Sequence, residues 1–132
     1  MKKIAIVNQR YGLEVNGGSE YYTRLIANKL NEIYDVEILT TRALNYDTWE
    51  NYYSEGLHKV EGIKVRRFST SRKRNMLRFR IISKLLQLYK KSSHYLEAKW
   101  IDEQGPLSEG LIKYIHNNKD KYDIFIFVTY LY

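Results

Sequence analysis

The fold is decided near the start of the chain, by the stretch KIAIVNQRYGLEVNGGSEYYTRLIANKLNEIYDVEILTT at residues 3–41. Its opening, Lys3–Asn8, is a short run of apolar and β-branched residues, which is typical of a strand buried on both faces of a parallel sheet. Residues 19–34 repeat apolar side chains at helical spacing, and residues 35–40 alternate as a second strand does. A strand, a helix and a strand in this order predict a right-handed βαβ unit.

The rest of the chain continues the alternation of strands and helices. Residues 63–68 predict a third strand, residues 77–91 an amphipathic helix, residues 106–117 another helix, and residues 123–128 a fourth strand. The polar, Tyr-rich residues 42–57 have no steady period and are interpreted as a long functional loop. The fold class is therefore α/β: a three-layer, Rossmann-like domain whose mainly parallel sheet has four or more strands, in the order 3-2-1-4.

Composition limits the function. The 132 residues are enough for one domain, and the absence of Cys excludes disulfides, thiol nucleophiles and Cys-bound metals, which favours a cytoplasmic location. A formal net charge of +7 points to anionic partners. The chain stops at Tyr132, shortly after an apolar strand that a helix should cover, so we expect a fragment of a longer protein.

The loop after the first strand is the first place to look for chemistry, because ligands bind beyond the carboxyl ends of parallel strands. Gly17 and Gly18 allow a phosphate or sugar to approach the backbone, and the helix start at Ser19 and Glu20 offers free N–H groups. A tight turn without a ligand explains the same glycines. The loop lacks the patterns GxGxxG and GxxxxGK[ST], which argues against dinucleotide and P-loop sites. Glu20 suits the helix dipole, and the alternative role is to orient the loop or a sugar hydroxyl.

With these residues in view, the chain resembles the N-terminal domain of family 4 glycosyltransferases, which are retaining enzymes of the GT-B fold. The segment Gly17-Gly18-Ser19-Glu20 is similar to that family's GG[AS]E signature, and it follows an opening strand as it does there. Residues 36–41, Trp100 with residues 104–106, and residues 123–130 are similar to segments of some bacterial members. The resemblance covers the whole chain.

The resemblance implies a function and a division of labour. The full-length protein would transfer a sugar, with retention, from a nucleotide-sugar to a saccharide or lipid-linked acceptor in bacterial surface polysaccharide synthesis, without a further cofactor. Residues 1–132 would form the acceptor-side domain, inactive alone, and an absent C-terminal domain would bind the nucleotide-sugar through an E-x7-E element. The loop expected to face the donor diphosphate is Gly17, Gly18, Ser19 and Glu20.

Acceptor binding is assigned to a second group of residues. The candidates are Tyr46, Asp47, Trp49, Thr129 and Tyr130. Many members of the family carry a His at the end of the fourth strand, whereas this chain has Thr129 and Tyr130, so the catalytic residues stay unassigned. His58, His94 and His116 are scattered, and no metal site is expected.

The excess positive charge is concentrated between Lys64 and Lys91, where the chain carries no Asp or Glu. The helix over residues 77–91 can pack its apolar arc on the sheet, or it can lie on an anionic bilayer at the inner face of the membrane. In the second interpretation the membrane-facing residues are Arg80, Lys84, Lys90 and Lys91. The alternative to an enzyme is a stand-alone binding domain for an anionic partner, either an acidic membrane or nucleic acid. The absence of a nucleic-acid module disfavours the latter.

Overall fold

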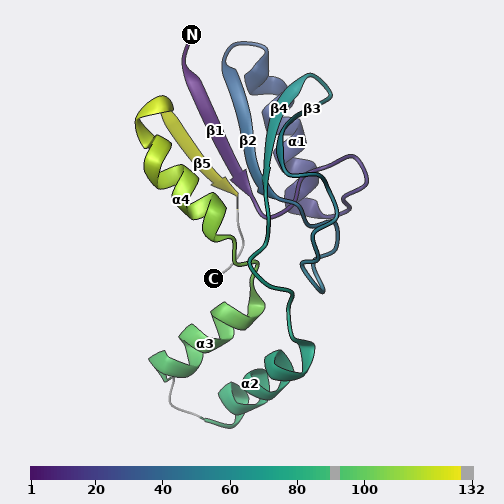
Figure 1. The fold of residues 1–132 in the computed structure, drawn as a ribbon, viewed down its shortest axis with the longest axis vertical. Coiled ribbons are helices and arrows are strands. Elements are labelled where there is room, and N and C mark those ends of the chain that lie inside the picture. Colours follow the sequence, from purple (N-terminus) through teal and green to yellow (C-terminus); the bar gives the residue numbers. More distant parts are fainter. Residues whose placement is uncertain (90–92, 129–132) are drawn as a thin grey trace.

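A computed structural model describes residues 1–89 and 93–128, and these residues form an α/β structure with one sheet and four α-helices (Figure 1). In chain order the elements are β1 (Lys3–Asn8), α1 (Gly18–Asn31), β2 (Asp35–Thr41), β3 (Gly56–Val60), β4 (Ile63–Phe68), α2 (Met76–Leu88), α3 (His94–Gln104), α4 (Glu109–Asn118), the 3₁₀ turn η1 (Lys119–Lys121) and β5 (Ile124–Val128). Within the described ranges no helix is long and apolar enough to cross a membrane.

The sheet that the described residues form is mixed and has five strands in the order β3-β4-β2-β1-β5. Neighbours among β4, β2, β1 and β5 pair in parallel, and β3 pairs with β4 antiparallel. The expected order 3-2-1-4 in a mainly parallel sheet is therefore corrected. The difference arises from β3, whose first two residues were interpreted as loop and whose other residues had no predicted element. It is joined to β4 by Glu61 and Gly62, whose φ angles of 50° and 82° are typical of a two-residue hairpin turn.

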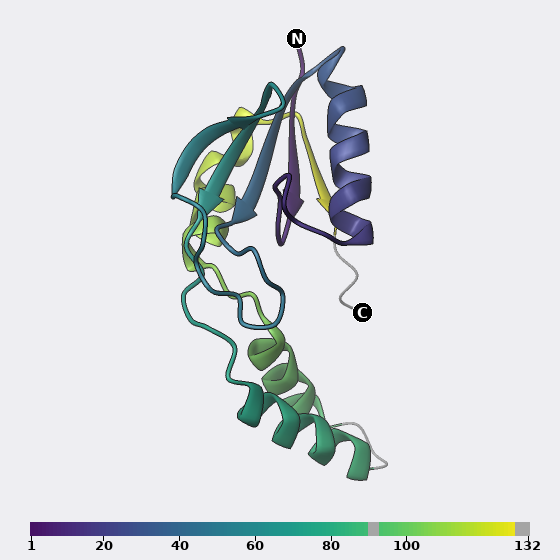
Figure 2. The same cartoon turned by 90° about the vertical axis from the view of Figure 1, so that its right-hand side faces the viewer.

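Helices cover both faces of the sheet, α1 on one side and α4 on the other (Figure 2). Successive residues of β1 alternate between the two cores: Ile4 and Ile6 belong to the cluster beneath α1, and Ala5 belongs to the cluster beneath α4. Because helices cover both faces of the sheet, the side chains on both faces of β1 are buried. This explains the continuous apolar run of β1.

Helix α1 is shorter than its sequence pattern suggested, and the face that it buries matches that pattern only in part. It ends at Asn31 instead of residue 34, and Tyr22 is 58% exposed. The buried residues are Glu20, Thr23 and Ala27. Thr23 and Ala27 are small, so the helix approaches the sheet closely along this face. Of the larger apolar side chains of this segment, Ile26 and Leu30 pack against the core, and Leu25 is exposed like Tyr22.

Helices α2 and α3 form a hairpin that extends beyond the carboxyl ends of the strands, away from the sheet (Figures 1 and 2). The expectation that the apolar arc of residues 77–91 packs on the sheet is wrong. Helix α2 packs on α3 instead: the rings of Phe79 and Trp100 lie 5.7 Å apart, and Trp100 Nε1 donates to Ser83 Oγ at 3.0 Å. Helix α3 lies in a region for which the sequence gave no predicted element.

Candidate functional site

The site is built on the loop that joins β1 to α1 at the carboxyl edge of the sheet. Helix α1 begins at Gly18, and its N-cap is Gly17, so no side chain caps the helix. The first N–H groups of a helix have no partner within it, and an uncapped start leaves them available to an anion. The predicted position of this loop, after the first strand and before the first helix, is confirmed.

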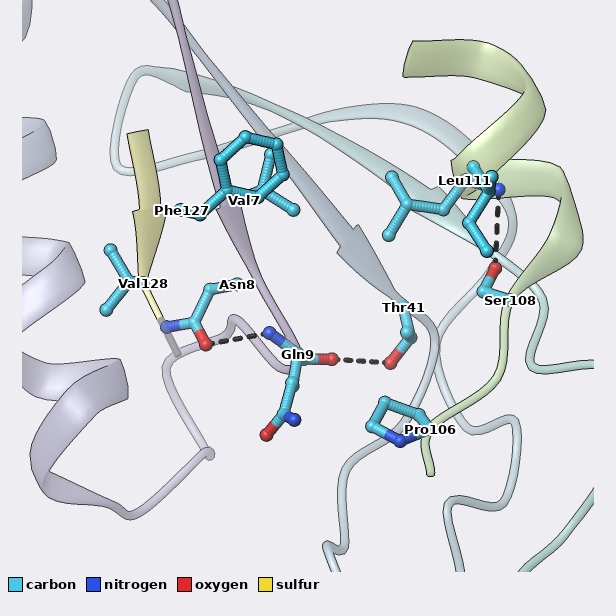
Figure 3. Close-up of a pocket in the computed structure, with 10 residues that line it drawn as sticks. Val7, Asn8, Gln9, Thr41, Pro106, Ser108, Leu111, Phe127 and Val128 are labelled. Atoms are coloured by element: carbon cyan, nitrogen blue, oxygen red, sulfur yellow. Dashed lines mark hydrogen bonds between the residues drawn. The ribbon is translucent and has the colours of Figure 1, made fainter. Parts of the chain in front are cut away.

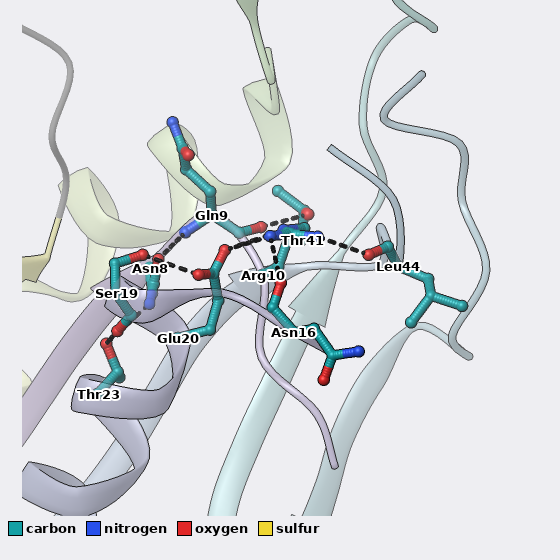
Figure 4. Close-up of polar contacts among 9 residues, drawn as sticks. All are labelled: Asn8, Gln9, Arg10, Asn16, Ser19, Glu20, Thr23, Thr41 and Leu44. Carbon is teal, nitrogen blue, oxygen red and sulfur yellow. Dashed lines mark hydrogen bonds and ion pairs between the residues drawn. The ribbon is translucent and has the colours of Figure 1, made fainter. Parts of the chain in front are cut away.

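A buried ion pair holds the loop in shape (Figure 4). Arg10 donates from Nε and Nη2 to Glu20 Oε1 at 2.9 and 2.7 Å, and the two side chains are only 6% and 2% exposed. The other carboxylate oxygen of Glu20 accepts from Ser19 Oγ at 2.9 Å. Arg10 also donates to the carbonyls of Asn16 and Leu44. Glu20 is therefore a residue that orients the loop, which was one of the roles expected for it, and Arg10 is the partner that the sequence did not reveal.

The two glycines have different reasons to lack a side chain. A Cβ on Gly17 would collide with the carboxylate of Glu20 and approach Arg10 Nη2 to 3.2 Å. A Cβ on Gly18 would meet nothing within 4 Å. Gly17 therefore makes room for the ion pair, and only Gly18 leaves open space beside the helix start. The approach of a ligand to the backbone of both glycines stays a prediction, and the open space is found beside Gly18.

The end of β2 and the long segment that follows it are joined to the glycine loop by hydrogen bonds. Thr41 Oγ1 donates to the carbonyl of Gln9 at 2.6 Å, and Tyr53 OH donates to Glu14 Oε2 at 2.6 Å. Burial and the hydrogen bond to Glu14 raise the pKa of Tyr53 well above its usual value, and the same hydrogen bond lowers the pKa of Glu14. Tyr53 therefore stays a neutral donor at physiological pH, which suits a structural tie better than an acid–base role.

A polar pocket of about 260 Å³ lies between the two loops. It is lined by Arg10, Glu14, Asn16, Leu44, Asn45, Tyr46 and Asp47. The guanidinium of Arg10 lies 5.4 Å from the centre of the Tyr46 ring, so Arg10 links the pocket to Glu20 and the glycine loop. The structure thus brings Tyr46 and Asp47 to the same edge as Gly17–Glu20. Asn16 and Asn45 also line the pocket. The only sequence signal for them is that each directly precedes an expected site residue.

A second, mainly apolar pocket of about 140 Å³ lies at the carboxyl ends of β1, β2 and β5 and the start of α4 (Figure 3). Its wall includes Val7, Gln9, Thr41, Pro106 and Phe127. The expected acceptor residues Thr129 and Tyr130 directly follow β5 in the sequence, but they lie outside the described residues. The expected membrane-facing residues Lys90 and Lys91 also lie outside the described residues, whereas Arg80 and Lys84 are exposed on α2.

Trp49 does not line the polar pocket and is only 3% exposed. Its Nε1 donates to the carbonyl of Gln104 at 2.6 Å, and its backbone carbonyl accepts from Thr70 Oγ1 at 2.8 Å. The Arg74 guanidinium lies 5.2 Å from the centre of its ring. Both the ring and the indole N–H are therefore occupied within the protein. The assignment of Trp49 to acceptor binding is not supported by this placement.

The site contains hydrogen-bonding and charged groups but no metal centre within the part of the chain that the structure describes, where no three His, Asp or Glu side chains gather at ligand spacing. Its chemistry is that of recognition: backbone N–H groups for an anion, and amides, carboxylates and one aromatic ring for a polar ligand. No family model, curated protein or solved structure matches this chain.

Proposed function

We propose that this chain is the Rossmann-like, acceptor-side half of a retaining GT-B glycosyltransferase, which transfers a sugar from a nucleotide-sugar to a saccharide or lipid-linked acceptor in bacterial surface polysaccharide synthesis. One observation carries the proposal. The open helix start at Gly18 and the polar pocket beside Tyr46 lie at the same edge of the sheet, and the Arg10–Glu20 ion pair joins them. An anion site next to a polyhydroxyl site is the arrangement that sugar transfer from a diphosphate donor requires.

On the donor side, the backbone of α1 supplies the recognition. A diphosphate approaching Gly18 meets unpaired N–H groups and the positive end of the helix dipole. Glu20 does not oppose the negative charge of the donor, because Arg10 neutralises it inside the protein. The nucleotide and most of the donor sugar would be held by a second domain across the cleft, as the resemblance implies.

On the acceptor side, the polar pocket has the chemistry of a saccharide site. The side chains of Asn16, Asn45 and Asp47 offer hydrogen-bond donors and acceptors to hydroxyl groups, and Tyr46, which is 57% exposed, offers a ring face to a sugar. A volume of about 260 Å³ lies just below the range of about 300–1,000 Å³ that is usual for pockets of drug-sized ligands. The pocket therefore suits a single sugar unit.

The proposal is tested by sugar transfer with the protein expressed from its entire reading frame. Radiolabelled nucleotide-sugars are offered with saccharide and lipid-linked acceptors, and the anomeric configuration of the product is determined by NMR. We expect transfer with retention. Tyr46→Ala and Asp47→Asn should raise the KM for the acceptor and leave the KM for the donor unchanged.

Tyr52→Ala is the matched control, because Tyr52 is a comparably exposed tyrosine of the same loop that does not line the pocket. Absence of transfer with every donor would contradict the proposal, and so would equal effects of Tyr46→Ala and Tyr52→Ala.

The second candidate is a stand-alone binding domain for an anionic partner, and the net charge of +7 favours it. The two candidates differ in what the polar pocket does. A binding domain should retain its anionic ligand when Tyr46 and Asp47 are replaced, and it should consume no nucleotide-sugar. Turnover that depends on the pocket would exclude this candidate.

A further inference from the structure

The hairpin of α2 and α3 leaves part of its surface without a partner inside the protein. Helix α2 contacts α3 through the side that carries Phe79 and Ser83. No residue of α2 is buried. A helix that packs on a neighbour along one side has its other side available for another surface.

The free side of α2 carries an apolar stripe. Leu77, Ile81, Leu85 and Leu88 are 70%, 50%, 36% and 77% exposed. Their spacing of four, four and three residues places them on one arc of the helix. Tyr89, which directly follows the helix, is 62% exposed. Four large aliphatic side chains in one row form a contiguous apolar surface, and such surfaces mark interaction sites.

Positive charges border this stripe. On a helical wheel Arg80 and Lys84 lie along one side of the stripe, and Arg78 lies along the other. No Asp or Glu occurs between Lys64 and Lys91. Of these three cations, Arg78 approaches a carboxylate, that of Glu103 on α3, at 3.8 Å. Arg80 and Lys84 have no ion pair with any described residue.

We propose that α2 docks on the surface of an anionic lipid bilayer, with Leu77, Ile81 and Leu88 inserted among the acyl chains. The cations beside the stripe explain the choice of occupant. Arg and Lys can lay their aliphatic stems along an apolar surface while their charged ends reach lipid phosphates. A nucleic acid would use the charges and leave the aliphatic row exposed to water, and an apolar protein groove would not need the flanking charges.

Docking would also orient the proposed site. The hairpin extends from the carboxyl edge of the sheet, the edge that carries the glycine loop and the polar pocket (Figures 1 and 2). A protein held by this hairpin presents that edge toward the membrane. Membrane docking does not depend on sugar transfer, and the two are measured separately.

Co-sedimentation of the protein with vesicles tests the proposal, using phosphatidylcholine with and without phosphatidylglycerol. We expect binding to the anionic vesicles only, and release by salt. The double variant Arg80→Gln/Lys84→Gln should weaken binding about 30-fold, since each basic residue near an anionic surface contributes about fivefold. Ile81→Gln/Leu88→Gln should weaken it at least about tenfold. All four positions are exposed, so the fold should be retained.

Matched controls change the same chemistry elsewhere. Leu25→Gln/Ile33→Gln removes two exposed apolar side chains, one on α1 and one in the turn after it, and Lys119→Gln/Lys121→Gln removes two exposed charges at η1. Neither should alter vesicle binding. Equal binding to neutral and anionic vesicles, or equal loss in the controls, would overturn the proposal. It would also be overturned by retention of a single-stranded oligonucleotide more tightly than anionic vesicles, or by self-association that only the α2 variants abolish.

Discussion

At the scale of single residues, Glu20 connects most of the candidate site. Its carboxylate neutralises Arg10, accepts from Ser19 and occupies the volume that a side chain at position 17 would fill. Breaking a buried ion pair by removing one partner costs about 3–5 kcal/mol, because the other charge stays buried without compensation. The loop between β1 and α1 is therefore held by charge as well as by backbone geometry.

The two glycines should respond differently to alanine. Gly17→Ala should lower the free energy of unfolding by about 1–3 kcal/mol, because the added methyl group displaces the Glu20 carboxylate. Gly18→Ala adds its methyl group to open space and should change stability by less than about 0.5 kcal/mol, while reducing sugar transfer. Urea denaturation and the transfer assay measure the two effects. Equal loss of stability in both variants would contradict the separate roles of the glycines.

Two residues of the loop between β2 and β3, Trp49 and Tyr46, should affect different properties of the protein. Trp49→Phe removes one hydrogen bond to Gln104 and should destabilise the protein by about 1 kcal/mol without changing the KM for the acceptor. Tyr46→Ala should do the reverse, because Tyr46 is exposed at the pocket. Denaturation curves and acceptor kinetics distinguish them. A raised acceptor KM in Trp49→Phe with normal stability would show that Trp49 takes part in acceptor binding.

At the scale of elements, charges tie the central strands together in addition to the backbone ladder. Glu37 on β2 is 1% exposed and lies 3.2 Å from Lys3 Nζ on β1 and 2.8 Å from Arg66 Nε on β4. Burial raises the pKa of Glu37, and the hydrogen bonds from Arg66 and Lys3 outweigh it, so the net pKa is lowered. The three neighbouring strands β1, β2 and β4 thus share one carboxylate.

This carboxylate should make stability depend on pH. Because the pKa of Glu37 is lower in the folded state than in the unfolded chain, its contribution is fully present above about pH 4.3 and is lost as the pH falls through the folded pKa. The free energy of unfolding, measured by urea denaturation between neutral and acidic pH, should fall less steeply below pH 4 in Glu37→Gln. The exposed Glu32→Gln should keep the wild-type slope. An unchanged slope in Glu37→Gln would refute the assignment.

At the scale of the whole molecule, the chain combines a covered sheet with a hairpin that stands apart from it. Two cores lie on opposite faces of the sheet, under α1 and α4. Helices α2 and α3 depend mainly on each other. Elements with few buried contacts open at lower free energy than core strands. The hairpin should therefore be the less stable part of the molecule, and a bound surface should stabilise it.

Hydrogen exchange followed by mass spectrometry can observe this difference. Peptides from α2 should exchange faster than peptides from β1 and β2, because α2 has no buried residue. Anionic vesicles should slow exchange in α2 and leave the strands unchanged. Protection of α2 equal to that of β1 without vesicles would contradict the picture of a weakly supported hairpin.

The sequence by itself determined the βαβ unit at residues 3–41 and the strands β4 and β5, because periodicity and β-branching act between neighbours in the chain. It placed the glycine loop at the carboxyl edge for the same reason. Only the tertiary structure decided that β3 extends the sheet and that α2 packs on α3 instead of on the sheet. It also decided that Trp49 is buried and that Arg10 forms an ion pair with Glu20. These outcomes depend on which surfaces and charges come into contact after the chain has folded back on itself. Local sequence patterns do not predict those contacts.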